Sequence, residues 1–383
     1  MRVLIAGVST RGFAESATRA GYEVTTVDGF GDLDLRARAR TVTLARGEGG
    51  RFSIHAALAA ARAVRRDLTC YVASFENHPE AVEALGGQGA MCGNAPAVLA
   101  RVRDPAQLAR ALSARGIATP AVRLTQPAGG AGGAGGADGR RWLVKPRASG
   151  GGAGIVAWRG GRIPTGRYLQ ERVVGVPGSV VFAADGRSAV PLGVSRGLAG
   201  DRAFGATGFK YCGSILLRPE EPMFGYARGL AEAVTAEFGL VGVNGIDFVV
   251  AHGIPYAVEV NPRYTASMEL VERAHGISIF ETHVRACAGT LPKVPAPTPG
   301  REMETWGKAI LYARRRVIPS DTKSWLADPD VRDVPPADEP IAPGHPICTI
   351  FAREQDPDRC LVELARRASR LFRALEHGEA RIA

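Results

Sequence analysis

Two short apolar segments that carry acidic and amide side chains constrain this chain more than any other feature. They are Gly245–Val250 and Tyr256–Arg263, and a short polar turn separates them, which predicts a β-hairpin. Asp247 lies in the first strand, and Glu259 and Asn261 are two residues apart in the second, so the latter two leave the same face. Carboxylates within apolar strands need partners, because an unpaired buried carboxylate is costly.

The polar side chains of this hairpin fit a divalent cation. Two carboxylates and an amide oxygen form a hard-oxygen site, which suits Mg2+ (or Mn2+) shared with substrate phosphates. The set is Asp247, Glu259 and Asn261, and Arg263 is expected to place a fixed cation beside the metal. The alternative is a surface hairpin with scattered polar residues, which accounts poorly for acids inside apolar strands.

The composition restricts the class of protein. A chain of 383 residues should hold two or three lobes, and 45% hydrophobic with 22% charged residues is ordinary for a globular protein. No apolar run reaches the length of a membrane helix, and the N-terminus enters a strand without a signal-peptide pattern. The six cysteines lack zinc-type spacing, so we expect free thiols in a reducing cytoplasm.

The net charge of +10 favours anionic ligands such as nucleotides and polycarboxylates. The arginines are spread along the chain, and the sequence shows no nucleic-acid-binding motif and no basic tail with interleaved aromatics. We therefore expect small-molecule ligands, with no nucleic acid and no membrane partner. A homodimer is the candidate assembly.

The first part of the chain alternates strand and helix patterns, which is typical of an open parallel sheet. Ligands of such sheets bind at the carboxyl ends of the strands. Asp28 and the loop residues Glu76 and Asn77 are therefore candidates for substrate contact, with loop capping as the alternative role. The expected strands cover 3–8, 22–28 and 68–74, and the expected helices cover 13–20, 54–65, 79–85, 95–102 and 105–115.

A second hairpin is predicted by strands over 141–146 and 155–158, with a glycine-rich loop at its tip. Backbone N–H groups of such a tip can wrap polyphosphate oxygens, because no side chain blocks their approach. Lys145 on the first strand would supply a point charge for the phosphates.

The order of these features resembles the ATP-grasp superfamily of carboxylate–amine ligases and biotin-dependent carboxylases. It consists of an α/β lobe, the Lys-plus-glycine hairpin, the Gln170-Glu171 segment and the Asp…Glu-x-Asn-Pro-Arg hairpin, and it covers nearly the whole chain. The resemblance implies an α/β, ATP-grasp fold with an N-terminal open parallel domain. The expected units are 1–118, a lid over 119–175 with a flexible insertion at 127–139, and a C-terminal subdomain over 176–383.

The resemblance also implies roles for single residues. Asp247, Glu259 and Asn261 would hold magnesium, and Arg263 would stabilise an acyl-phosphate. Lys145 and Arg263 are the expected catalytic residues. The expected ATP contacts are Lys145, Ser149 and the lid glycines Gly151, Gly152 and Gly154 for the phosphates, and Gln170, Glu171 and the backbone near Val173 for adenine.

Three features depart from the superfamily pattern. The second ATP-binding cation at the end of the first lobe has only Arg101 or Arg103 as candidates, and either could be a helix-surface arginine. The ribose carboxylate that often follows the hinge is replaced by Val174-Gly175. The biotin-acceptor segment of multidomain carboxylases does not occur in this sequence.

The C-terminal tail predicts strands over 308–313 and 344–352 and an amphipathic helix over 359–375. These elements resemble the closing strands and helix of biotin carboxylase-like relatives, so the tail should be part of the fold. Cys348 is expected to be a buried small hydrophobe, and His283 to be structural.

The opening of the chain resembles a group known only as predicted ATP-dependent carboligases. The resemblance implies amide-bond formation from small-molecule carboxylate and amine substrates through an acyl-phosphate, with release of ADP and phosphate. Glutamate or amine ligation in one-carbon coenzyme synthesis is an analogy at the level of the fold. Arg263 and Lys210 would suit the carboxylate, and Asp28 and Glu76 the amine. The alternatives are a bicarbonate-using carboxylase and a non-catalytic ATP-binding subunit.

Overall fold

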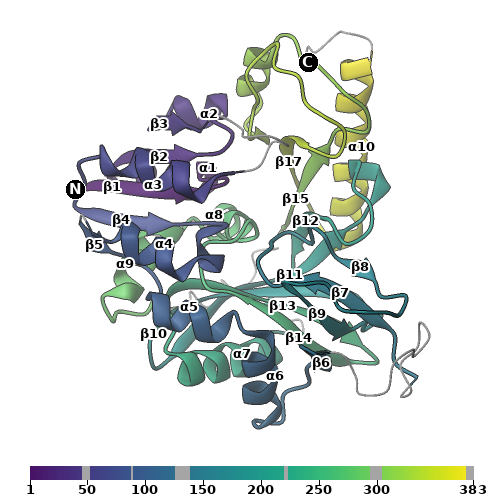
Figure 1. Ribbon diagram of the computed structural model, residues 1–383. Helices are drawn as coiled ribbons and strands as arrows, with labels where there is room; N and C mark the ends of the chain where they lie inside the picture. Colours follow the sequence, from purple (N-terminus) through teal and green to yellow (C-terminus); the bar gives the residue numbers. More distant parts are fainter. Residues whose placement is uncertain (45–51, 88, 126–138, 220–222, 294–303, 377–383) are drawn as a thin grey trace.

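The computed structural model describes residues 1–44, 52–87, 89–125, 139–219, 223–293 and 304–376. The expected insertion over 127–139 lies almost entirely outside these residues. Within them, three sheets of five, four and eight strands form the frame (Figure 1). None of the described helices combines the length and the apolar character that crossing a membrane requires.

The first sheet confirms the expected open parallel arrangement, with strand order β3-β2-β1-β4-β5. Its central strand is buried because Val3, Leu4 and Ile5 form an unbroken apolar run. The expected strand over 68–74 is shorter, since its pairing with β1 ends at Tyr71. The elements of this lobe are β1 (Arg2–Gly7), α1 (Arg11–Arg19), β2 (Glu23–Asp28), α2 (Leu33–Arg36), β3 (Arg40–Thr43), α3 (Ile54–Arg62), β4 (Leu68–Tyr71), η2 (Phe75–Asn77), α4 (Pro79–Leu85), β5 (Ala90–Met91), α5 (Pro96–Val102) and α6 (Pro105–Ser113).

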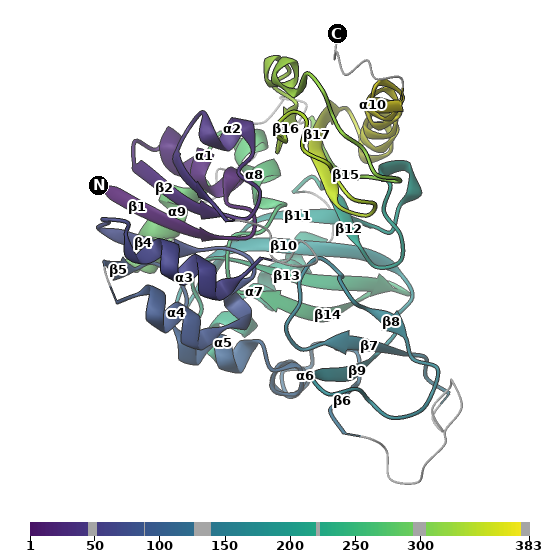
Figure 2. The ribbon, with the colours of Figure 1, turned by 45° about the horizontal axis from the view of Figure 1, so that its top comes forward.

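The second sheet is a small antiparallel unit of order β6-β9-β7-β8, which we call the lid sheet. Trp142, Val144, Trp158 and Leu169 form its own small core. It lies beside the edge strand β14 of the third sheet in both views (Figures 1 and 2). The strands are β6 (Val122–Arg123), β7 (Trp142–Pro146), β8 (Val156–Ala157) and β9 (Arg167–Glu171).

The third sheet is antiparallel, in the order β14-β13-β10-β11-β12-β15-β17-β16. The tail strands β15 and β17 belong to it, which confirms the expectation that the tail is part of the fold. The strands are β10 (Val176–Asp185), β11 (Ala189–Ala199), β12 (Tyr211–Leu216), β13 (Val241–Ala251), β14 (Ile254–Asn261), β15 (Thr305–Tyr312), β16 (Val331–Arg332) and β17 (Pro346–Glu354), and the helices of this part are η3 (Arg202–Phe204), α7 (Met223–Phe238), α8 (Met268–His275), α9 (Ile279–Cys287), η4 (Thr322–Ala327) and α10 (Pro357–Glu376).

Helix α10 covers β15 and β17 with one apolar face (Figure 1). Cys360, Leu364, Ala368 and Leu371 are buried at helical spacing, as the amphipathic pattern predicts. The helix starts where the carboxylate of Asp356 accepts two backbone N–H groups of the first turn. Helix α10 therefore closes the tail against the large sheet.

The first lobe and the large sheet share one hydrophobic core. Phe13 of α1 stacks on Tyr264 with ring centroids 4.8 Å apart, and it also contacts Phe280 of α9. Val181 of β10 and Val271 of α8 belong to the same buried cluster. This continuous core fixes the first lobe relative to the hairpin strands β13 and β14.

Candidate active site

A cavity of about 560 Å³ lies where the three sheets meet. One part of its wall is formed by the lid residues Lys145, Gly151 and Gly152 and by the β13–β14 hairpin, and another by loops of the first lobe and of the tail. This volume lies in the range of small-molecule sites. The cavity is therefore the candidate active site.

The hairpin places its polar side chains as the sequence predicts. Asp247 of β13 lies opposite Glu259 of β14, and Gly245 lies opposite Asn261. The Nδ2 atom of Asn261 donates to the Oδ2 atom of Asp247 over 2.9 Å. All three polar side chains line the cavity.

The two carboxylates of the hairpin differ in their electrostatic surroundings. Burial and the neighbouring charge of Glu259 raise the pKa of Asp247 to about 6. Burial alone would raise the pKa of Glu259, but Arg103 and Lys145 outweigh it and hold that pKa below its ordinary value. Two facing carboxylates with one raised pKa form a site that a divalent cation would stabilise.

Arg103, rather than Arg101, reaches this site. Its Nη1 atom donates to Oε1 of Glu259 over 2.6 Å, and its Nη2 atom donates to Asn77 over 2.8 Å. Arg101 is half-exposed and donates instead to the backbone carbonyl of Glu237. Arg103 therefore fixes a hairpin carboxylate, and Asn77 fixes Arg103.

Lys145 enters the cavity from β7 in a fixed orientation. Its Nζ atom donates to Oε1 of Gln170 over 3.0 Å and lies 3.8 Å from Oε2 of Glu259. The Nε2 atom of Gln170 in turn donates to the carbonyl of Val258. Gln170 thus links the lid sheet to the hairpin strand and orients the lysine.

The glycine loop is docked onto the large sheet. The carbonyl of Gly151 accepts a hydrogen bond of 3.0 Å from the N–H of Tyr211. Gly152 has a φ of +77°, and a Cβ atom there would overlap the carbonyl oxygen of Phe209. The carbonyl of Ser149, at the start of the loop, accepts from Arg103 over 3.2 Å. The loop therefore covers the part of the cavity that holds Lys145.

Arg263 lies at the end of the hairpin and lines the cavity. Its Nε atom donates to Oε1 of Glu76 over 2.7 Å, and its Nη2 atom lies 3.3 Å from Oδ1 of Asn261. Glu76 is only 1% exposed, so this pair is buried. The loop after β4 therefore positions the arginine, and the role of Glu76 is to hold Arg263 in place.

The other expected site residues lie outside the set of described residues that line the cavity. Both carboxylate oxygens of Asp28 accept hydrogen bonds from Thr10, Phe30 and Gly31, so this acid fixes two loops of the first lobe. Lys210 donates to the carbonyl of Gly344 over 2.5 Å. Their substrate contacts stay predictions.

Glu171 and Val173, the expected adenine contacts, also lie outside the described residues that line the cavity. The carboxylate of Glu171 forms an ion pair of 3.2 Å with Arg140 and accepts from the N–H of Ala121. Val173 is partly buried in the segment that leads into β10. Gly154 accepts a hydrogen bond from Arg167 through its carbonyl at the base of the loop. These ATP contacts likewise stay predictions.

The structure adds a buried ion network that the sequence does not reveal. Arg11 of α1 is 2% exposed and donates to Glu269 of α8 over 3.0 Å and to Asp333 of the tail over 2.8 Å. Lys308 of β15 donates to the same Glu269 over 2.7 Å. All four side chains line the cavity. In the sequence, the signal that could have pointed to this network is Lys308, a lysine at the start of an apolar strand.

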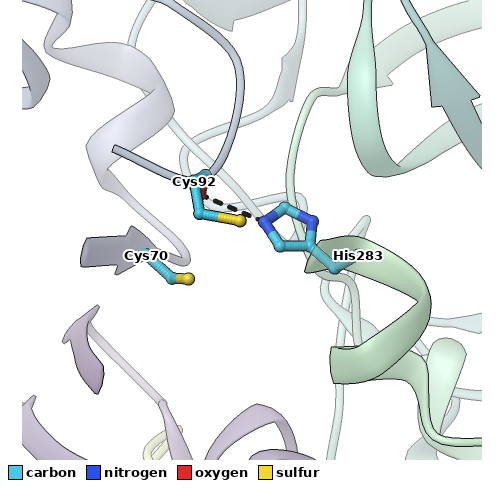
Figure 3. A group of neighbouring side chains, drawn as sticks. All are labelled: Cys70, Cys92 and His283. Atoms are coloured by element: carbon cyan, nitrogen blue, oxygen red, sulfur yellow. Dashed lines mark hydrogen bonds between the residues drawn. The ribbon is translucent and has the colours of Figure 1, made fainter. Parts of the chain in front are cut away.

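A cluster of thiols and a histidine lies outside the cavity, between the first lobe and α9 (Figure 3). Cys70, Cys92 and His283 converge there, and all three are buried. The Nδ1 atom of His283 accepts from the N–H of Val243, so the proton sits on Nε2, which faces the Cys92 carbonyl at 3.1 Å. Because neither ring nitrogen keeps a free lone pair, the geometry supports the structural role expected for His283 rather than metal binding.

Comparison with known proteins identifies the architecture. The model of a family described as the ATP-grasp domain matches residues 102–267, which span Arg103, the lid and the hairpin. Residues 102–267 therefore match an ATP-grasp domain. A curated relative of this chain, an uncharacterized protein of Methanocaldococcus jannaschii, is 27% identical over 123 residues, which are 32% of this chain and 28% of the relative.

Solved structures share the ATP-grasp fold over almost the whole chain. Pyruvate carboxylase from Rhizobium etli matches 99% of this chain with a TM-score of 0.72 and 15% identity, and the chain spans 39% of that protein. N5-carboxyaminoimidazole synthetase from Staphylococcus aureus matches 96% of this chain and 97% of its own, with a TM-score of 0.69 and 14% identity. An L-amino acid ligase from Bacillus licheniformis covers 97% of both chains, with a TM-score of 0.66 and 16% identity. At these identities the likeness establishes the fold.

Proposed function

We propose that this protein is an ATP-dependent carboxylate–amine ligase that works through an acyl-phosphate. The observation that carries this proposal is the continuity of the cavity. The glycine loop, Lys145 and the hairpin set occupy one part, and a second part extends toward the first lobe. A nucleotide and a second substrate can therefore meet at Arg263, between the two parts.

The chain's own residues would supply charge and position. Lys145, fixed by Gln170, would bind phosphate oxygens. Asp247, Glu259 and Asn261 fit Mg2+ or Mn2+, which would neutralise charge on the phosphates during transfer. Arg263, fixed by Glu76, would bind the acyl-phosphate oxygens with its remaining N–H groups.

The proposed reaction needs no nucleophilic side chain. The substrate carboxylate attacks the γ-phosphorus of ATP, the bond to the β-phosphate oxygen breaks, and ADP leaves. The amine then attacks the acyl carbon, phosphate leaves, and the amine nitrogen loses a proton. Positioning and electrostatic stabilisation therefore account for catalysis.

The test is an ADP-release screen of the purified protein over carboxylates and amines, coupled to mass spectrometry of the products. We expect ADP release that needs Mg2+ or Mn2+, stops in excess EDTA, and rises only when a carboxylate and an amine are both present. The product should be an amide of the two. Glutamate is the first carboxylate to try, and one-carbon coenzyme precursors follow.

Three other results of the screen would contradict the proposal, and each would indicate a different function. AMP and pyrophosphate would indicate an adenylating enzyme. Bicarbonate-dependent ADP release without an amine would indicate a carboxylase. ATP binding without any stimulated turnover would indicate a non-catalytic subunit. A cytoplasmic location, where the six free thiols would stay reduced, and a homodimer are further parts of the proposal.

A further inference from the structure

We propose that the part of the cavity between the first lobe and the tail is a subsite for a protonated amine, and that Asp32 binds it. This inference deepens the proposed function and rests on it, because it assigns the amine substrate to a place. The amine site expected from the sequence, at Asp28 and Glu76, does not fit, because Asp28 is used by loop hydrogen bonds and Glu76 by Arg263.

Asp32 is a buried acid that faces the cavity without a partner. It is 6% exposed and lines the cavity just before α2. Its carboxylate caps no N–H of that helix, and it forms no hydrogen bond or ion pair with any other described residue. Because an unpaired buried carboxylate is costly, such a group indicates a cationic ligand.

The charges around Asp32 favour a cation as well. Among the described residues that line this part of the cavity, the cations are Arg11 and Lys308 and the carboxylates are Asp32, Glu269, Asp333 and Glu339. The two cations already pair with Glu269 and Asp333. Of the acids in this part of the cavity, Asp32 and Glu339 at the rim therefore have no cation among the described lining residues to pair with. A carboxylate substrate would meet net negative charge here, whereas an ammonium group would balance it.

The pKa of Asp32 is consistent with this reading. Burial, followed by the neighbouring Asp333, raises its pKa well above the ordinary value. A bound ammonium group would oppose both effects and favour the carboxylate form.

An organic cation fits better than a second metal ion. In the described part of the chain, the one group of three metal-type ligands close enough to share an ion is the cluster of Cys70, Cys92 and His283. The described acids around Asp32 do not form such a group of three. The neighbouring wall is apolar, with Phe30, Pro335, Pro336 and Ile341, which suits the hydrocarbon part of an amine.

The test measures binding separately from turnover. Protein saturated with Mg2+ and a non-hydrolysable ATP analogue is titrated by calorimetry with hexylamine, benzylamine and 1,5-diaminopentane. Each monoamine is compared with the alcohol and the carboxylic acid of the same carbon skeleton. We expect at least one amine to bind about tenfold or more tighter than its neutral and anionic counterparts, the size of one charge-assisted hydrogen bond.

Two variants locate the site. Asp32→Asn keeps the shape of the side chain and should weaken amine binding about tenfold to a hundredfold. Glu339→Gln, at the exposed rim, should weaken it less. Asp321→Asn is the matched control, because this exposed acid lies outside the cavity lining. Affinity for the ATP analogue should be unchanged in all three, and none of the three should lower the melting temperature.

The outcomes separate this inference from the proposed ligase activity. Equal binding of amine, alcohol and acid by the wild-type protein, or unchanged amine affinity in Asp32→Asn, would overturn the subsite. If Asp32→Asn does not fold, the comparison of wild type with Glu339→Gln decides, and unchanged affinity there overturns the proposal. Selective amine binding without amine-stimulated ADP release would leave the subsite standing and sink the ligase instead.

Discussion

Single side chains of the site act through their neighbours. Glu259 receives Arg103 from the first lobe and lies near Lys145 from the lid, so one carboxylate joins three parts of the molecule. Asp247, its partner across the strands, accepts a hydrogen bond from Asn261 and forms no ion pair with any Lys or Arg that the structure describes. The pair is therefore unequal, because Arg103 and Lys145 lie near the charge of Glu259 and no such cation pairs with Asp247 among the described residues.

Glu259→Gln should retain the fold and lose turnover. The amide oxygen can still accept from Arg103, but the charge that would face the metal is gone. We expect kcat to fall about 10²–10³-fold, as for other lost electrostatic contacts. Steady-state ADP release measures the effect, and the exposed Glu232→Gln serves as the control. Wild-type activity in Glu259→Gln would remove the metal assignment.

Asp247 should make stability depend on pH in the metal-free protein. Its pKa in the folded state, about 6, is above the unfolded value near 3.8. The folded state therefore binds the proton more tightly, and the stability from this proton is present below about pH 4 and lost as the pH rises to about 6.

The measurement is urea unfolding of wild type and Asp247→Asn in EDTA between pH 4 and pH 7. The stability of wild type relative to the variant should fall by up to about 3 kcal/mol across this window, for a shift of about two units. Parallel curves for the two proteins would show that Asp247 titrates at its ordinary pKa.

Among the elements, the glycine loop makes the most specific backbone contact. Gly152→Ala should prevent docking, because the new Cβ overlaps the Phe209 carbonyl. We expect kcat/KM for ATP to fall about tenfold to a hundredfold, as for small misplacements of reacting groups. Gly161→Ala is the matched control, because Gly161 has a similar φ of +83° with no heavy atom within 4 Å of a Cβ. Equal losses in both variants would attribute the effect to backbone strain alone.

Elements with local signals were predictable from the sequence. The hairpin of β13 and β14 follows from alternation and a turn, and helix α10 from its apolar spacing. The long strands β10 and β11 have no comparable prediction, because they are buried on both sides and lack a clear alternating pattern.

In the site, too, residues with a local sequence signal were predictable, and residues placed by tertiary contacts were not. Arg101 and Arg103 have the same local surroundings, and only tertiary contact with Glu259 separates them. Asp32 was not predictable, because its loop meets a tail segment about 300 residues away, where Asp34 accepts from the N–H of Val334.

At the scale of the whole molecule, Arg11 holds three parts together. Arg11→Met should leave Glu269 and Asp333 buried with fewer partners, and the loss should be about 3–5 kcal/mol of unfolding free energy. Urea denaturation measures it. Arg2→Met, which breaks the exposed pair with Asp67, should change stability little. Equal effects of the two substitutions would contradict a clamping role for Arg11.

The docked glycine loop has a kinetic consequence. On the proposed function, a nucleotide bound beneath it would leave after the hydrogen bond between Gly151 and Tyr211 opens, so its departure would be tied to a backbone rearrangement. The residence time of ADP would then be governed by how often the loop lifts. At saturating substrate, kcat would then be limited by the opening of the glycine loop rather than by the chemical steps.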